Sequence, residues 1–181
     1  LCLFPVHIDI WHGLIFVCYA ATPDISLHEH LAPLKQEILA YPIEQYNFYK
    51  QVHHPARCNW KTYVDNYLEA YHIPYVHPGL SRELNMASYD VEWQGNVCIH
   101  RAQTKGESSQ KGLWAYVYPD LALNIYHDGM NIEKIVPSHV QETILQYHYY
   151  FLDPQPAEDA IRMSQQTTTE DVAVCEDVQK N

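Results

Sequence analysis

The feature that most constrains the fold of this chain is a run of strand-like segments over residues 88–152. Short turns separate the segments, which is the pattern of an antiparallel meander. The predicted helices precede and follow this run and do not alternate with its strands, which favours an α+β fold over a parallel α/β sheet. The segments are SYDVEWQGNVCIHRAQ, LWAYVYP, LALNIYHD, MNIEKIVPS and QETILQYHYYFL, with a polar loop at residues 104–112.

The flanking segments supply the helices and an N-terminal hairpin. Apolar residues recur at helical spacing in three stretches, which predicts helices there. The predicted elements are strands at residues 4–11 and 14–20 joined by a turn at His12-Gly13, a helix from Ser26 to Ala40, a strand at residues 46–54, a helix from Ala56 to His72, a loop at residues 78–85, and a helix from Ala157 that could break at Thr167 to Thr169.

Composition narrows the class of protein. A length of 181 residues suits one domain with a sizeable core. The net charge of −11 argues against a nucleic-acid partner. The longest apolar stretch, GLIFVCYAA, is too short to span a bilayer, and no signal peptide opens the chain. Five scattered cysteines without a CxxC pair fit reduced thiols, so we expect a cytoplasmic protein without a membrane segment.

The segment NWKTYVDNYLEAYHIPYVHPGL is the candidate for chemistry. Asp65, Glu69 and His72 have the spacing of one helical face, so their side chains can meet. His77 would lie about 140° away from His72 on a continuous helix, too far for both to bind one ion. Pro74 predicts that the helix ends near it and lets His77 approach His72. The alternative is that both histidines are ordinary surface or core residues.

A carboxylate in the last predicted helix helps to decide whether the two histidines bind a metal. Asp171 shares a helix face with Val174, Cys175 and Val178, whereas Glu170 and Asp177 lie on other faces and can stay in water. A buried aspartate needs a cation or several hydrogen-bond donors. A metal held by two histidines would serve, and two histidines with one carboxylate are typical of non-haem Fe(II) oxygenases. A buried Lys or Arg partner, or a helix-start position for Asp171, would also explain it.

These segments resemble a known family. CNWKTYVDNYLEAYHIPYVHPGL is similar to the iron-binding segment of Rieske-type non-haem iron oxygenases, the ring-hydroxylating oxygenase α subunits. FPVHIDIWHGLIFV, YPDLALNIYHDGMNIEKIVP and TTTEDVAVCEDVQ resemble other parts of the same catalytic domain. The resemblance implies a helix-grip (START-like) fold, in which a curved antiparallel sheet packs against helices. It also implies that residues 1–181 are one catalytic domain, incomplete at the C-terminus.

The resemblance assigns roles to individual residues. His72, His77 and Asp171 would be the ligands of a mononuclear Fe(II). Glu69 would connect His72 to a Rieske-cluster histidine of a neighbouring subunit, and Asn66 would lie close to the iron. Asp65 would act behind Glu69 on the same helix face. Zn or Ni could also occupy these ligands in a purified sample.

The string DNYLEAYH, with NIYHDGMNIEKIVP later, looks most like the branch that acts on quaternary ammonium compounds such as choline, carnitine and glycine betaine. The implied activity is O2-dependent hydroxylation of such a small-molecule substrate. An aromatic-ring dioxygenase is the alternative within the family, and a non-catalytic helix-grip binding domain is the alternative outside it.

One departure from the family is visible in the sequence. A Rieske [2Fe-2S] cluster needs Cys-x-His followed by Cys-x-x-His. This chain has one Cys-x-His, at Cys98 to His100, but no second Cys/His pair follows it. The chain opens and closes within patterned segments, so we expect a longer polypeptide whose N-terminal Rieske domain is absent from this chain. The alternative is a degenerate relative that has no Rieske domain. The resemblance further implies a homotrimer and an NAD(P)H-dependent reductase. The fragment alone should bind metal without turning over.

Overall fold

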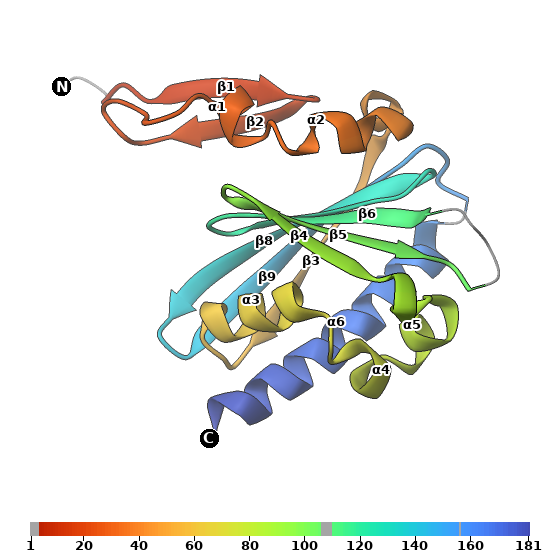
Figure 1. The fold of residues 1–181 in the computed structure, drawn as a ribbon. Helices are drawn as coiled ribbons and strands as arrows, with labels where there is room; N and C mark the ends of the chain where they lie inside the picture. The colour runs from red at the N-terminus through yellow and green to blue at the C-terminus, as the bar shows by residue number, and fades with distance from the viewer. Residues whose placement is uncertain (1–3, 106–109, 156) are drawn as a thin grey trace.

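The computed structural model describes residues 4–105, 110–155 and 157–181, and it shows three layers. A central antiparallel sheet separates an N-terminal layer from a layer of helices (Figure 1). The order of the sheet is β3-β9-β8-β7-β6-β5-β4, so neighbours in sequence from β4 to β9 are neighbours in space. The predicted α+β helix-grip architecture and the antiparallel meander are confirmed. The strands are β3 (Asn47–Ala56), β4 (Asp90–Gln94), β5 (Val97–Gln103), β6 (Gln110–Val117), β7 (Leu121–Ile125), β8 (Gly129–His139) and β9 (Glu142–Phe151).

Side chains on the central strands alternate between two different environments, as the period of two in a strand requires. On β8, Met130 and Ile132 pack into an apolar cluster beneath the N-terminal layer. Their neighbours Asn131 and Glu133 are also buried, but they line a cavity on the opposite face. The same alternation places His100 of β5 and Asn124 of β7 on the cavity face. One face of the sheet is therefore an apolar core, and the other carries buried polar groups.

The N-terminal layer consists of a hairpin and short helices. The hairpin pairs β1 (His7–Trp11) with β2 (Leu14–Cys18) through His12 and Gly13, as predicted. Both turn residues have positive φ, 47° and 82°, which suits a tight two-residue hairpin turn. The helix predicted over residues 26–40 is wrong as one element. It divides into α1 (Leu27–His30), α2 (Leu34–Glu37) and η1 (Ile38–Ala40), because Pro33 has no N–H to donate to the preceding turn.

The helical layer lies on the cavity face. Helices α3 (Trp60–Glu69) and α6 (Ala157–Gln179) pack together there (Figure 1). The break considered at Thr167 to Thr169 does not occur, and α6 is continuous. The three hydroxyls hydrogen-bond to carbonyls four residues earlier in the helix, so the threonines stay within it. The loop predicted at residues 78–85 is wrong, because α5 (Pro78–Glu83) forms there.

The remaining short elements are 3-10 turns, η2 (Ile43–Gln45) and η3 (Met86–Ser88). Part of the polar loop predicted at residues 104–112 lies outside the described residues. The four cysteines that the structure describes are free thiols, as the sequence predicts. Among the described helices, none has the length and apolar character needed to cross a membrane.

Candidate metal centre

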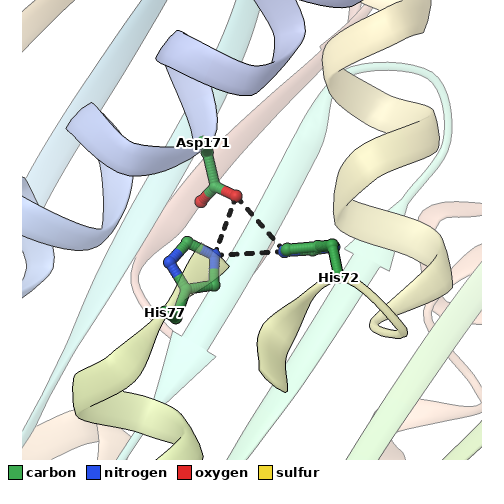
Figure 2. Close-up of side chains that lie close together, drawn as sticks. All are labelled: His72, His77 and Asp171. Carbon is green, nitrogen blue, oxygen red and sulfur yellow. Dashed lines mark hydrogen bonds and ion pairs between the residues drawn. The ribbon is translucent and has the colours of Figure 1, made fainter. Parts of the chain in front are cut away.

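Three side chains converge on one point between α6 and the segment after α3. Figure 2 shows His72, His77 and Asp171 pointing toward one another. The two Nε2 atoms are 3.1 Å apart. The Asp171 Oδ1 atom lies 3.0 Å from Nε2 of His77 and 3.3 Å from Nε2 of His72. Residues far apart in sequence thus bring two imidazole nitrogens and one carboxylate oxygen to a common centre.

The backbone that delivers the two histidines differs from the prediction. Helix α3 ends at Glu69, and the next residue, Ala70, is left-handed with a φ of 58°. The Glu69 carboxylate then accepts hydrogen bonds from the backbone N–H groups of Tyr71 and His72. The helix therefore ends five residues before Pro74, because the Glu69 side chain satisfies the backbone of the turn that follows.

A short helix sets the spacing of the histidines. Helix α4 (Ile73–Val76) begins after His72 and ends before His77, with Pro74 in its first turn, where proline is tolerated. Pro74 therefore supports a helix start, and the prediction that it ends the preceding helix is wrong. His77 lies between α4 and α5, so each imidazole flanks the same single helical turn.

A carboxylate holds the far nitrogen of each imidazole. Nδ1 of His72 lies 2.5 Å from Oε1 of Glu69, and Nδ1 of His77 lies 2.8 Å from Oε2 of Glu170. A carboxylate accepts, so each Nδ1 carries the proton and each Nε2 offers a lone pair to the common centre. The prediction that Glu170 stays in water is wrong. Helix α6 turns Glu170 toward His77 and leaves only 26% of its side chain exposed.

The electrostatics of the cluster follow from these contacts. Burial lowers the pKa of His72, but hydrogen bonds to Asp171 and Glu69 outweigh burial and raise it overall. The pKa of His77 is also raised, because hydrogen bonds to Asp171 and Glu170 outweigh burial. Burial raises the pKa of Asp171, yet hydrogen bonds from both histidines and Asn66 bring it below the ordinary value. The cluster therefore favours a cation next to the Asp171 carboxylate.

A divalent metal fits this donor set. The two Nε2 atoms and a carboxylate oxygen face one another, an arrangement that a cation bound between them would stabilise. His72, His77 and Asp171 offer one ligand atom each, and these atoms lie within 4.8 Å of one another. Two histidines and one carboxylate on one side leave coordination positions open on the other. The residues that are present can therefore hold iron.

The alternatives for Asp171 do not fit its surroundings. Asp171 lies in the C-terminal half of α6, which excludes a helix-start role. Its ion pairs in the described part of the chain are with His72 and His77. The apolar stripe predicted around it is partly confirmed, because Cys175 is fully buried whereas Val178 is 56% exposed.

The other predicted site residues divide into two groups. Asn66 donates from Nδ2 to Oδ1 of Asp171 over 2.6 Å, so it contacts one of the three converging side chains directly. Glu69 contacts His72 as described above. Asp65 is exposed on the outer side of α3, and it is not among the residues that line the cavity. The helix face expected to join Asp65, Glu69 and His72 does not form, because His72 lies beyond the end of α3.

A cavity of about 560 Å³ adjoins the three converging side chains. His72, His77 and Asp171 contribute to its wall, and aromatic side chains from the sheet and α3 form much of the rest. The buried polar residues of the cavity face were not identified from the sequence. The signal that could have revealed Glu133 is its position as a charged residue inside the apolar strand segment MNIEKIV. The aromatic lining includes Tyr63, Tyr67, Tyr89, Trp114, Tyr126, Tyr147, Tyr149 and Phe151.

Together the fold and this cluster define a helix-grip domain with a candidate metal centre of two histidines and one carboxylate. Residues 43–181 match the family described as ring hydroxylating alpha subunit (catalytic domain). The chain belongs to this family. The resemblance to Rieske-type oxygenases stated from the sequence is thereby confirmed.

Individual relatives agree with this assignment. The chain is 28% identical to a chloroplastic choline monooxygenase from Atriplex hortensis, over 98% of the chain and 44% of that protein. It is 25% identical to the carnitine monooxygenase oxygenase subunit of Escherichia coli K12, over 84% of the chain and 44% of that protein. The chain thus spans less than half of the length of these relatives.

A solved quaternary ammonium Rieske monooxygenase has the same fold. Its structure is described as giving insights into carnitine oxidation by gut microbiota and inter-subunit electron transfer. The TM-score is 0.84 at 19% identity, over 98% of this chain and 52% of that one.

Proposed function

We propose that this domain binds a mononuclear Fe(II) through His72, His77 and Asp171 and activates O2 to hydroxylate a small organic substrate. The observation that carries the proposal is the convergence of the two Nε2 atoms and Oδ1 of Asp171 on one point at the cavity wall. Iron in this position would supply O2 activation. The names of the relatives, choline and carnitine monooxygenases, support a quaternary ammonium compound as the substrate.

The other residues of the site would hold the ligands in place. Glu69 and Glu170 keep each histidine in the tautomer that leaves Nε2 free to bind. Asn66 holds Oδ1 of Asp171 and so limits its rotation. The cavity would bind the substrate and exclude water from the reacting groups.

Metal analysis tests the ligand assignment. We expect the purified chain, reconstituted anaerobically with Fe(II), to contain one iron per chain. His72→Ala, His77→Ala and Asp171→Ala should each abolish stoichiometric binding, because each removes one of three ligands. Asp177→Ala, an exposed position on the same helix, is the control. A variant that retains full iron content would show that the substituted residue is not a ligand, and a wild-type chain without affinity for iron would refute the proposal.

Electrons would come from a Rieske [2Fe-2S] cluster, whose binding motif lies outside this sequence. We propose that Glu69 connects His72 to the cluster domain of a neighbouring subunit in a homotrimer, with an NAD(P)H-dependent reductase upstream. The Glu69 side chain is 21% exposed and lies beside the exposed Tyr71, so a partner could reach it. A protein that includes the cluster should keep its iron in the Glu69→Gln variant and reduce it more slowly. An unchanged single-turnover reduction rate would exclude this role.

Substrate class is tested with the same cluster-containing protein and a reductase. We expect oxygen uptake with a quaternary ammonium compound among choline, carnitine and glycine betaine. Uptake with simple arenes alone would instead identify an aromatic-ring dioxygenase. A domain that binds small molecules but no metal would be a non-catalytic carrier. A cytoplasmic location remains a prediction from the scattered cysteines, and the choline monooxygenase relative is described as chloroplastic.

A further inference from the structure

A buried carboxylate in the cavity has no part in holding the metal ligands. Glu133 lies on β8, lines the cavity and is 2% exposed. Its Oε1 atom has no hydrogen-bond partner within the described residues. An ionised carboxylate in such a place is costly unless a cation or several donors satisfy it. Glu133 therefore points to a ligand that the protein itself does not supply.

The surroundings of Glu133 place it close to the candidate metal centre. Its cross-strand neighbour on β9 is Tyr147. Burial raises the pKa of Glu133, and hydrogen bonds from Tyr63 of α3 and from Tyr147 offset only part of that rise. The Tyr147 hydroxyl also lies 2.9 Å from Oγ1 of Thr168 on α6. Thr168 precedes Asp171 by three positions along α6, about one turn or ~5 Å, and Tyr63 precedes Asn66, which hydrogen-bonds to Asp171, by the same spacing along α3. A ligand held by Glu133 would therefore lie within reach of the metal.

The cavity walls around Glu133 are aromatic. Tyr67, Trp114, Tyr126 and Tyr149 line the same space. Trp114 donates from Nε1 to the Tyr126 hydroxyl over 3.0 Å, and these two rings meet edge to face. Such contacts fix the orientation of the rings. Ring faces attract methylated ammonium groups, which have no N–H to donate and so do not depend on hydrogen-bond acceptors.

The carboxylate side chains that line the cavity give its wall a negative charge. The ionisable residues of the described lining, apart from histidines and tyrosines, are all acidic: Glu83, Asp128, Glu133, Glu170 and Asp171. None of the lining residues that the structure describes is a lysine or an arginine. A substrate with its own carboxylate would thus bring a negative charge among acidic side chains, with no lysine or arginine in the described lining to pair with it, which is unfavourable.

We propose that Glu133 is the counter-ion of a substrate ammonium group, and that the cavity selects quaternary ammonium cations without a carboxylate over zwitterions. Choline belongs to the first class, and carnitine and glycine betaine belong to the second. This inference rests on the proposed quaternary ammonium substrate. It adds the residue that determines specificity and the direction of the preference.

Calorimetric titration of the purified chain tests this inference, with and without Fe(II). The probes are choline, its neutral isostere 3,3-dimethyl-1-butanol, carnitine and glycine betaine. We expect choline to bind at least tenfold more tightly than its neutral isostere and than either zwitterion. In Glu133→Gln, the preference for choline over the isostere should fall by about tenfold or more, because one buried opposite charge is lost. Glu142→Gln, an exposed acid on β9, should leave the preference unchanged.

The ratio between choline and its isostere separates a counter-ion from a purely structural acid. A structural defect would weaken both probes alike, whereas loss of a counter-ion weakens only the cation. Equal affinity of the wild-type chain for choline and the isostere would overturn the inference, as would an unchanged ratio in Glu133→Gln, tighter binding of carnitine, or no cation binding. The comparisons within the wild-type chain hold even if Glu133→Gln does not fold. Iron content of the same samples reports separately on the proposed metal function.

Discussion

The two faces of the central sheet are both buried, yet they are built from different residues. The face under the N-terminal layer is apolar, with residues such as Leu113 and Ile125 less than 2% exposed. The opposite face buries His100, Asn124 and other polar side chains around the cavity. The strands are shared, so the difference arises only from which alternate position each side chain occupies.

This comparison separates the source of stability from the source of function. Burying apolar surface stabilises the fold, whereas burying polar groups costs free energy unless each finds a partner. The cavity face meets part of that cost through hydrogen bonds, such as the one from Asn124 Nδ2 to Asn131 Oδ1 over 2.8 Å. We therefore expect substitutions on the apolar face to change unfolding free energy, and substitutions on the cavity face to change pH dependence and binding.

The largest expected effect is in the apolar cluster where Leu34 of α2 packs against the apolar face of the sheet. Leu34→Ala should lower the free energy of unfolding by about 2–5 kcal/mol, because it leaves a cavity at a fully buried position. Urea denaturation measures the change, and iron stoichiometry in the folded variant should not change. Leu39→Ala, where the side chain is 73% exposed, is the matched control. Loss of iron binding by a folded Leu34→Ala protein would show that the two faces are not separable.

On the cavity side, Glu170→Gln should weaken Fe(II) affinity by about 10–100-fold, because Nδ1 of His77 loses an anionic acceptor. A competition titration with a metal chelator measures the affinity. Glu158→Gln, an exposed acid on the same helix, should leave it unchanged. If the two variants bind iron equally well, then the contact between Glu170 and His77 has no role in metal binding.

A buried histidine on the cavity face, His100, should make the free energy of unfolding depend on pH. Burial lowers the pKa of His100 from its ordinary value of 6.5 to about 4, so the unfolded chain takes up this proton first as pH falls. The contribution to stability is complete above about pH 6.5 and is lost as pH falls toward 4, with about 2 kcal/mol lost between pH 7 and pH 5. Urea denaturation at both pH values should show this loss in the wild type and a smaller one in His100→Gln. His53→Gln, an exposed position on β3, should behave like the wild type.

The smallest expected effect concerns two threonines of α6. Thr168 is buried and bonds to the Tyr147 hydroxyl on the cavity face, whereas Thr169 is exposed and bonds only within its own helix. Thr168→Val should lower the free energy of unfolding by about 1 kcal/mol, since it removes one hydrogen bond between buried hydroxyls. Thr169→Val should change it by less than about 0.5 kcal/mol. Equal losses would mean that the bond to Tyr147 contributes nothing.

Much of the sheet was predictable from the sequence because period-two patterning and turn residues act locally. The hairpin and the meander needed no long-range information. The division of the first predicted helix was also predictable, because Pro33 lies inside it. The end of α3 was not, since no glycine marks the left-handed residue Ala70 and the effect comes from a bond between the Glu69 side chain and backbone that follows it.

The sequence was enough to predict which three side chains converge, but it was not enough to predict the residues that hold them in place. His72, His77 and Asp171 follow from family resemblance and from the cost of burying a charge. Glu170 was assigned to water because helix periodicity gives a side chain's direction only relative to its own helix. Its contact with His77 depends on how α6 packs against α4 and α5, which no local pattern encodes. The same limit hid Glu133, whose surroundings come from several elements.

The sequence separation of the three converging side chains has a consequence for folding. His77 and Asp171 are 94 positions apart, so a metal that joins them would act as a removable cross-link between the segment that follows α3 and the C-terminal helix α6. A ligand that binds only the folded chain adds stability in proportion to the logarithm of its free concentration. The iron available to a cell would then set how much of this protein persists as well as how active it is, and metal-starved chains would be the first to be degraded.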